Sequence, residues 1–110
     1  MNWIPLHSEQ QLEEIKVKST SRPQVIFKHS TRCSISAIAK SRLDKENAPA
    51  TYDFYFLDLI SYRNLSDKIA EFFKVYHESP QVLVIRNGAC IYDESHMGIS
   101  MKEIMTQAAW

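Results

Sequence analysis

Apolar residues recur along the chain in short groups, some spaced near 3.6 residues as in amphipathic helices and others continuous as in buried strands. Two capping-box patterns, at residues 8–11 and 100–103, mark helix starts. The pair Asn87-Gly88 is a strong signal for a β-hairpin. The pattern therefore predicts the order helix, strand, helix, strand, helix, strand, strand, helix, at residues 8–18, 24–29, 34–45, 52–58, 61–78, 81–85, 89–92 and from 100 onward.

The apolar positions of each predicted helix form one face that should pack against a sheet. These positions are Leu12 and Ile15 in the first helix, Ile35, Ile38, Ala39 and Leu43 in the second, Leu65, Ile69, Phe72 and Phe73 in the third, and Ile104 and Met105 in the last. Ser61 is placed to cap the third helix. The 52–58 run is strongly β-favouring and apolar nearly throughout, which predicts a central strand.

The order of the elements predicts how the strands pair. A right-handed crossover through the second helix makes the 24–29 and 52–58 strands parallel, and the 81–85 strand can pair antiparallel on the free side of the first of them. Antiparallel pairing sets the start of one strand against the end of the other, so we expect Pro80 to lie next to Cys33. With 110 residues, 45% of them hydrophobic, we expect one α/β domain over residues 1–110.

Composition narrows the class of protein. Thirteen basic residues balance thirteen acidic ones, which argues against a nucleic-acid or anionic-membrane partner. No apolar run approaches the roughly 20 residues that a membrane span requires, and the first five residues lack the features of a signal peptide. We therefore expect a cytoplasmic protein whose partner is a small molecule or another protein.

Two cysteines, Cys33 and Cys90, lie 57 positions apart, a spacing that predicts neither a disulfide framework nor a metal site. Cys33 follows a predicted strand and begins a predicted helix, where unpaired backbone N–H groups and the helix dipole favour a thiolate. Arg32 and Lys28 add positive charge nearby in the sequence. A buried structural cysteine is the alternative, but the polar neighbours of Cys33 disfavour it.

Ser36 stands where a Cys-x-x-Cys motif has its second thiol. A serine cannot resolve a disulfide, so a mixed disulfide on Cys33 would need a thiol from solution or from another protein. Ser36 is also placed to donate a hydrogen bond to the thiolate, although an ordinary helix-start serine explains it equally well. We interpret Cys90, beside Ile91 in a predicted strand, as a small core residue rather than a resolving thiol.

The four histidines, at positions 7, 29, 77 and 96, have no metal-binding spacing, and no metal site is predicted. His29 is placed to assist Cys33 as a base. A polar residue at a strand end is the simpler interpretation of it.

Several of these stretches resemble the thioredoxin superfamily, namely 33–36 after a β-run, Ser79-Pro80 before a strand, and the Asn87-Gly88 hairpin. Within it, the run 27–36 (Phe-Lys-His-Ser-Thr-Arg-Cys-Ser-Ile-Ser) and the opening 3–6 (Trp-Ile-Pro-Leu) resemble the YtxJ-like monothiol bacilliredoxins. The resemblance covers nearly the whole chain. It implies a thioredoxin-like fold, a three-layer α/β/α sandwich with a four-stranded mixed sheet and an extra N-terminal helix.

The resemblance also implies an activity, the removal of bacillithiol or a similar low-molecular-weight thiol from mixed disulfides on protein substrates. Cys33 matches the attacking cysteine, bacillithiol is the co-substrate, and no cofactor is implied. Pro80 matches the cis-proline of the superfamily, which would leave backbone groups of Ser79 free to pair with a bound thiol or peptide. The turn 98–100 resembles the place where glutaredoxins hold a ligand carboxylate. The expected substrate-binding residues are Arg32, Ser34, Ser36, Ser79, Pro80, Gly98 and Ser100.

Two other functions compete with this one. The first is a non-catalytic binding or stress module on the same fold, in which Cys33 is only a site of thiolation. The second is an iron–sulfur carrier that would use Cys33 and an external thiol as ligands. The chain lacks the Cys-Gly-Phe-Ser motif of such carriers, which disfavours the second.

Overall fold

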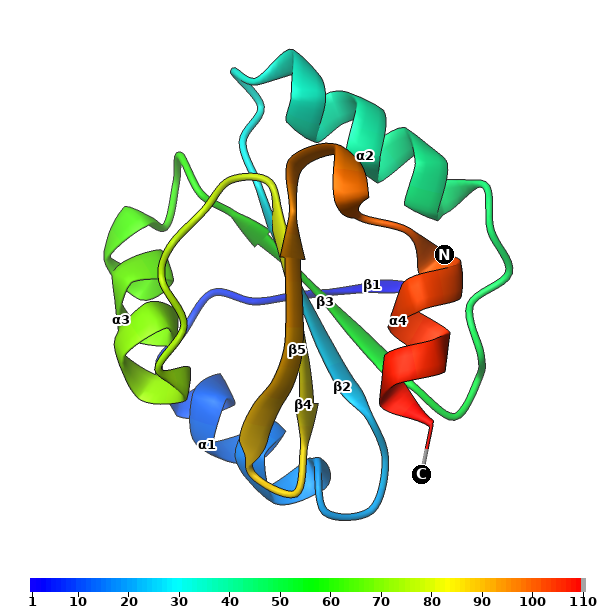
Figure 1. Cartoon of the computed structure of the whole chain (residues 1–110). Coiled ribbons are helices and arrows are strands. Elements are labelled where there is room, and N and C mark those ends of the chain that lie inside the picture. The colour runs from blue at the N-terminus through cyan, green and yellow to red at the C-terminus, as the bar shows by residue number, and fades with distance from the viewer. Residues whose placement is uncertain (110) are drawn as a thin grey trace.

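The computed structural model describes residues 1–109 and contains a five-stranded mixed sheet in the order β1-β3-β2-β4-β5 (Figure 1). The strands are β1 (Trp3–Pro5), β2 (Gln24–His29), β3 (Asp53–Asp58), β4 (Gln81–Arg86) and β5 (Ala89–Ser95). The helices are α1 (Gln10–Lys18), α2 (Ser34–Asp44), α3 (Arg63–Phe73) and α4 (Met101–Ala108), with a 3₁₀ turn η1 (His96–Gly98) before α4.

The central strand β2 is buried along its whole length and sets the geometry of the sheet. It pairs in parallel with β3, where His29 lies opposite Asp58, and antiparallel with β4, where Lys28 lies opposite Gln81. Both pairings confirm the predicted topology. The end of β2 and the start of β4 therefore meet at one edge of the sheet, which we call the Cys33 edge because Cys33 follows β2.

Helices cover both faces of the sheet, so the fold has three layers (Figure 1). Burial of apolar side chains between the sheet and each helical layer forms two core clusters. On one face, α1 and α3 contribute Leu12, Ile15, Leu65, Ile69 and Phe73. On the other face, α2 and α4 contribute Ala39, Leu43, Met101, Ile104 and Ala108. The predicted thioredoxin-like α/β architecture is thus correct.

The sheet has five strands rather than the four expected. The additional strand β1 pairs in parallel with β3, with Trp3 opposite Phe54. A strand of three residues that ends in Pro5 is too short to show alternation in the sequence. Aromatic packing holds β1 on the sheet, because the Trp3 ring stacks on the Phe27 ring with centroids 5.6 Å apart.

The helix boundaries differ from the prediction in α3. This helix begins at Arg63 and ends at Phe73, several residues before the expected end near Glu78. It ends because Lys74 adopts the left-handed conformation, with φ of 57°. Ser61 is not the cap, since its hydroxyl donates to the Asp58 carboxylate at 3.0 Å.

The predicted apolar face of α2 is only half correct. Ala39 and Leu43 are buried, whereas Ile35 and Ile38 are 38% and 47% exposed. Met105 of α4 is also exposed, contrary to expectation. Periodicity alone could not separate these positions from the core, since the spacing of apolar residues does not show how the helix is rotated about its axis relative to the sheet.

The turn and cap predicted near the C-terminus are confirmed. Asn87 and Gly88 both have positive φ, 53° and 81°, as a two-residue hairpin turn requires. The Ser100 hydroxyl accepts from the N–H of Glu103 at 3.2 Å and caps α4. Strand β5 runs to Ser95, beyond the expected end at Tyr92. Within residues 1–109, none of the helices has the length and apolarity needed to cross a membrane.

Candidate active site around Cys33

Cys33 is a half-buried free thiol that directly precedes α2 and acts as its N-cap residue. Its carbonyl accepts from the N–H of Ala37 at 3.1 Å, while its extended backbone (φ −113°, ψ 119°) turns the chain into the helix. In the described part of the chain, its sulfur makes no capping hydrogen bond. The thiol is therefore left beside the positive end of the α2 dipole.

The loop that delivers Cys33 is held by Ser30. The Ser30 carbonyl accepts from the N–H of Cys33 at 3.2 Å, and its hydroxyl accepts from the N–H of Arg32 at 3.3 Å. Ser30 is buried, whereas Arg32 and Ser34, on either side of Cys33, are exposed. Both residues that flank Cys33 are therefore open to solvent.

Ser36 lies behind this loop rather than at the surface. It is fully buried, and its hydroxyl accepts from the N–H of Ser30 at 3.0 Å and lies 2.7 Å from Nδ1 of His29. The expectation that Ser36 contacts a bound substrate conflicts with this burial. The contact with His29 could not be predicted from the sequence, because seven positions separate the two residues.

Ser79 and Pro80 lie at the Cys33 edge, immediately before β4, and the peptide bond between them is cis as predicted. The Ser79 hydroxyl is buried and has no hydrogen-bond partner within residues 1–109. The Pro80 carbonyl accepts from the N–H of His96 at 3.0 Å. The His96 ring lies 3.6 Å from the Glu78 carboxylate. Sequence reasoning missed His96 because no motif links it to Pro80.

Gly98 and Ser100 closely follow His96, whose N–H bonds to the Pro80 carbonyl at 3.0 Å. The turn η1 packs along α2, where Arg42 donates to the Met97 carbonyl at 3.2 Å. Ser100 lines a hollow with Arg42 and Glu46, and its hydroxyl already caps α4. The expected role of Gly98 and Ser100 in holding a ligand of Cys33 stays a prediction.

Cys90 lies at the opposite end of the sheet from Cys33. It is opposite Ile85, which in turn lies opposite Gln24 at the start of β2. The five residue steps of β2 at about 3.3 Å each put about 16 Å between these ends, far beyond the reach of a disulfide. Burial raises the pKa of Cys90 to about 11. Its partly buried side chain packs against the α1–α3 core, in line with its interpretation as a core residue.

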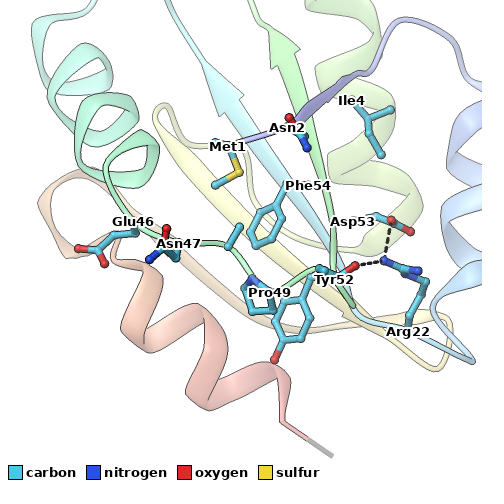
Figure 2. A pocket seen from close by; sticks show the side chains of 12 residues that line it. Met1, Asn2, Ile4, Arg22, Glu46, Asn47, Pro49, Tyr52, Asp53 and Phe54 are labelled. Carbon is cyan, nitrogen blue, oxygen red and sulfur yellow. Dashed lines mark hydrogen bonds and ion pairs between the residues drawn. The ribbon is translucent and has the colours of Figure 1, made fainter.

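A second hollow, drawn in Figure 2, lies beside the start of β3 and so at the end of the sheet away from Cys33. Two of its charged residues, Arg22 and Asp53, pair with each other at 3.2 Å, and Arg22 also donates to the Ala50 carbonyl at 2.8 Å. None of the expected site residues lines it. Among residues 1–109, no group of three or more His, Cys, Asp or Glu side chains gathers as metal ligands would.

Known proteins share the fold of this chain, and one protein family matches its sequence. The chain superposes with a TM-score of 0.80 on a protein described as a candidate oxidoreductase with a thioredoxin fold, at 33% identity over 96% of this chain and 91% of that one. Thioredoxin from Malassezia sympodialis shares the fold, with a TM-score of 0.74 at 15% identity over 98% of this chain and 92% of that one. Thioredoxin f2 from Chlamydomonas reinhardtii does so with a TM-score of 0.71 at 13% identity, over 96% and 92%. Residues 4–104 match the family described as monothiol bacilliredoxin BrxC, and the chain therefore belongs to this family.

Proposed function

We propose that this protein removes bacillithiol, or a thiol of similar size, from mixed disulfides on other proteins by means of the Cys33 thiolate. One observation carries the proposal: Cys33 is a free thiol at the N-terminus of α2, and the second cysteine lies at the far end of the sheet. Membership of the monothiol bacilliredoxin family supports the same chemistry.

The reaction has two exchange steps. In the first, the Cys33 thiolate attacks the bacillithiol sulfur of the mixed disulfide, the S–S bond breaks, and the substrate protein leaves as a thiolate that takes a proton from water. Cys33 then carries bacillithiol. In the second step, free bacillithiol attacks this adduct, which restores the Cys33 thiolate and forms the oxidised bacillithiol dimer. A free thiol is the reductant, because Ser36 has no sulfur and Cys90 is out of reach.

The surroundings of Cys33 divide into two groups in this proposal. Arg32 and Ser34 are exposed and meet the incoming disulfide, with Ser79 and Pro80 at the same edge of the sheet. Ser36 is buried and supports the loop from behind. A carboxylate-bearing thiol such as bacillithiol suits the positive charge of Arg32.

Mass spectrometry tests the proposal directly. Mixing the protein with a bacillithiolated substrate protein should add one bacillithiol to Cys33 and release reduced substrate in equal amount, and excess bacillithiol should then allow turnover. Cys33→Ser should abolish both steps, and Cys90→Ser, the matched control, should leave both within about twofold.

Three outcomes would contradict the proposal. Release of reduced substrate by Cys33→Ser would show that another group attacks. An adduct on Cys33 that excess thiol never discharges would favour the non-catalytic module. Loss of turnover in Cys90→Ser with the adduct intact would make Cys90 the resolving thiol.

A further inference from the structure

A continuous path of hydrogen bonds connects the buried end of β2 to the backbone of Cys33. Nδ1 of His29 lies 2.7 Å from the hydroxyl of Ser36, and that hydroxyl accepts from the N–H of Ser30 at 3.0 Å. The Ser30 carbonyl then accepts from the N–H of Cys33 at 3.2 Å. His29 is thus connected to Cys33 through two serines, one on α2 and one in the loop.

The His29 ring at the start of this path is held in place. It is only 6% exposed and packs against Phe27 and Phe56, with ring centroids 5.7 and 5.3 Å away. Burial and the charge of Lys40 on α2 lower the pKa of His29, while Asp58 at the end of β3 and Asp44 on α2 oppose them. The ring is therefore neutral at pH 7, and one of its nitrogens is free to accept a hydrogen bond.

The Ser36 hydroxyl forms hydrogen bonds with other groups of the protein. A hydroxyl has one proton to donate and can accept two hydrogen bonds. Ser36 accepts from the loop N–H, and the same hydroxyl is hydrogen-bonded with Nδ1 of His29. From this geometry we infer that His29 is a positioning residue, which acts through Ser36 to fix the loop that aims the Cys33 sulfur; the inference rests on the proposed role of Cys33 as nucleophile.

This role predicts a difference between two reactions of Cys33. Disulfide exchange needs the attacking sulfur in line with the bond that breaks, so it depends on how the loop is held, and a displacement of about 1 Å can cost about 100-fold. Alkylation by iodoacetamide has looser geometric demands and depends mainly on thiolate content and exposure. Loss of positioning should therefore slow exchange much more than alkylation.

The test uses two amide variants, His29→Asn and His29→Gln, in a Cys90→Ser background so that only Cys33 reacts. The Asn amide reaches the place of Nδ1 and can pair with Ser36, whereas the Gln amide extends to the place of Nε2. The probe is 5,5′-dithiobis(2-nitrobenzoate). The Cys33 thiolate attacks one of its sulfurs, the S–S bond breaks, and one coloured thiolate leaves for each new disulfide formed.

We expect His29→Gln to slow this exchange at least about tenfold. His29→Asn should stay within about threefold of the parent, and both variants should be alkylated by iodoacetamide within about twofold of it. Ser36→Ala should slow exchange as much as His29→Gln does. The double variant should be no slower than Ser36→Ala alone, because both changes break one path.

A matched control is available on the other face of the sheet. The buried hydroxyl of Ser66 on α3 lies 3.1 Å from Nδ1 of His77, the same pair of groups on the face away from α2. Ser66→Ala should leave both rates within about twofold. A loss of exchange in this variant would attribute the effect to general destabilisation and overturn the inference.

Other results would overturn it as well. These are parental exchange in His29→Gln, exchange in His29→Asn as slow as in His29→Gln, a double variant whose losses multiply, and alkylation that falls in parallel with exchange and with Tm. The probe is not a biological substrate, so failure of bacillithiol removal with this pattern intact would refute only the proposed function. Loss of the pattern with bacillithiol removal intact would refute only the role of His29.

Discussion

Lys28 offers a test of how burial controls charge in this fold. It is fully buried in β2, and its ammonium donates to the Ser66 carbonyl at 3.2 Å and lies 3.3 Å from Nδ1 of His77. Desolvation lowers the pKa of Lys28 from 10.5 to about 8, against the opposing charge of Asp67. Replacing Lys28 by methionine keeps a long unbranched side chain and removes the charge.

The magnitude follows from proton linkage. The folded protein binds this proton less tightly than the unfolded chain, so the ammonium destabilises the fold fully below pH 8, and the cost disappears as pH rises toward 10.5. At about 1.4 kcal/mol per pKa unit, the full cost is about 3 kcal/mol. About 2.5 kcal/mol of it is relieved between pH 7 and pH 10.

Urea unfolding at pH 7, 8, 9 and 10 measures this effect. Lys28→Met also loses two hydrogen bonds of about 1 kcal/mol each, so at pH 7 it should be about 1 to 2 kcal/mol more stable than the parent. At pH 10 it should be about 1 kcal/mol less stable. Lys102→Met on the exposed face of α4 is the control and should show no such change with pH. A stability difference for Lys28→Met that stays constant from pH 7 to pH 10 would refute the reasoning.

Two further predictions follow from the cap of α4 and from the two thiols. Ser100→Ala removes the bond to the Glu103 N–H and should lower the free energy of unfolding by about 1 kcal/mol, measured by urea unfolding; an unchanged value would show that water replaces the cap. At pH 8, iodoacetamide should label Cys33 and spare Cys90, since a thiol whose pKa is raised to about 11 stays protonated there. Mass spectrometry should count one label in the native state and two in denaturant, and rapid double labelling of the native state would contradict the burial of Cys90.

The sequence was sufficient for most of the architecture because its strongest signals are local. The hairpin at Asn87-Gly88, the Ser100 cap and the continuous apolar runs of β2 and β4 depend on neighbouring residues alone. Strand β1 is held by Trp3 against residues far along the chain, so no local pattern reveals it. The early end of α3 depends on the backbone of Lys74, a residue type with no special preference for the left-handed region.

The features of the candidate site that depend on residue type could be predicted from the sequence. The features that depend on burial were harder to predict. Cys33 could be located from its neighbours in the sequence, and the cis bond before Pro80 from the resemblance to the thioredoxin superfamily. The depth of Ser36 could not, since a serine at a helix start usually faces solvent. Neither could the contact of His96 with the Pro80 carbonyl, which forms only when β5 pairs with β4.

The buried hydroxyl of Ser36 limits how this protein could change its chemistry. Cysteine at position 36 would supply a resolving sulfur, but a thiol is a weaker hydrogen-bond donor and acceptor than a hydroxyl and a poorer partner for the Ser30 N–H and for His29. A dithiol version would therefore gain an internal route for releasing its adduct. The loop that positions Cys33 would, however, be held by weaker hydrogen bonds. One position has two incompatible uses, and conversion to a dithiol enzyme should require compensating changes at His29 or Ser30 as well.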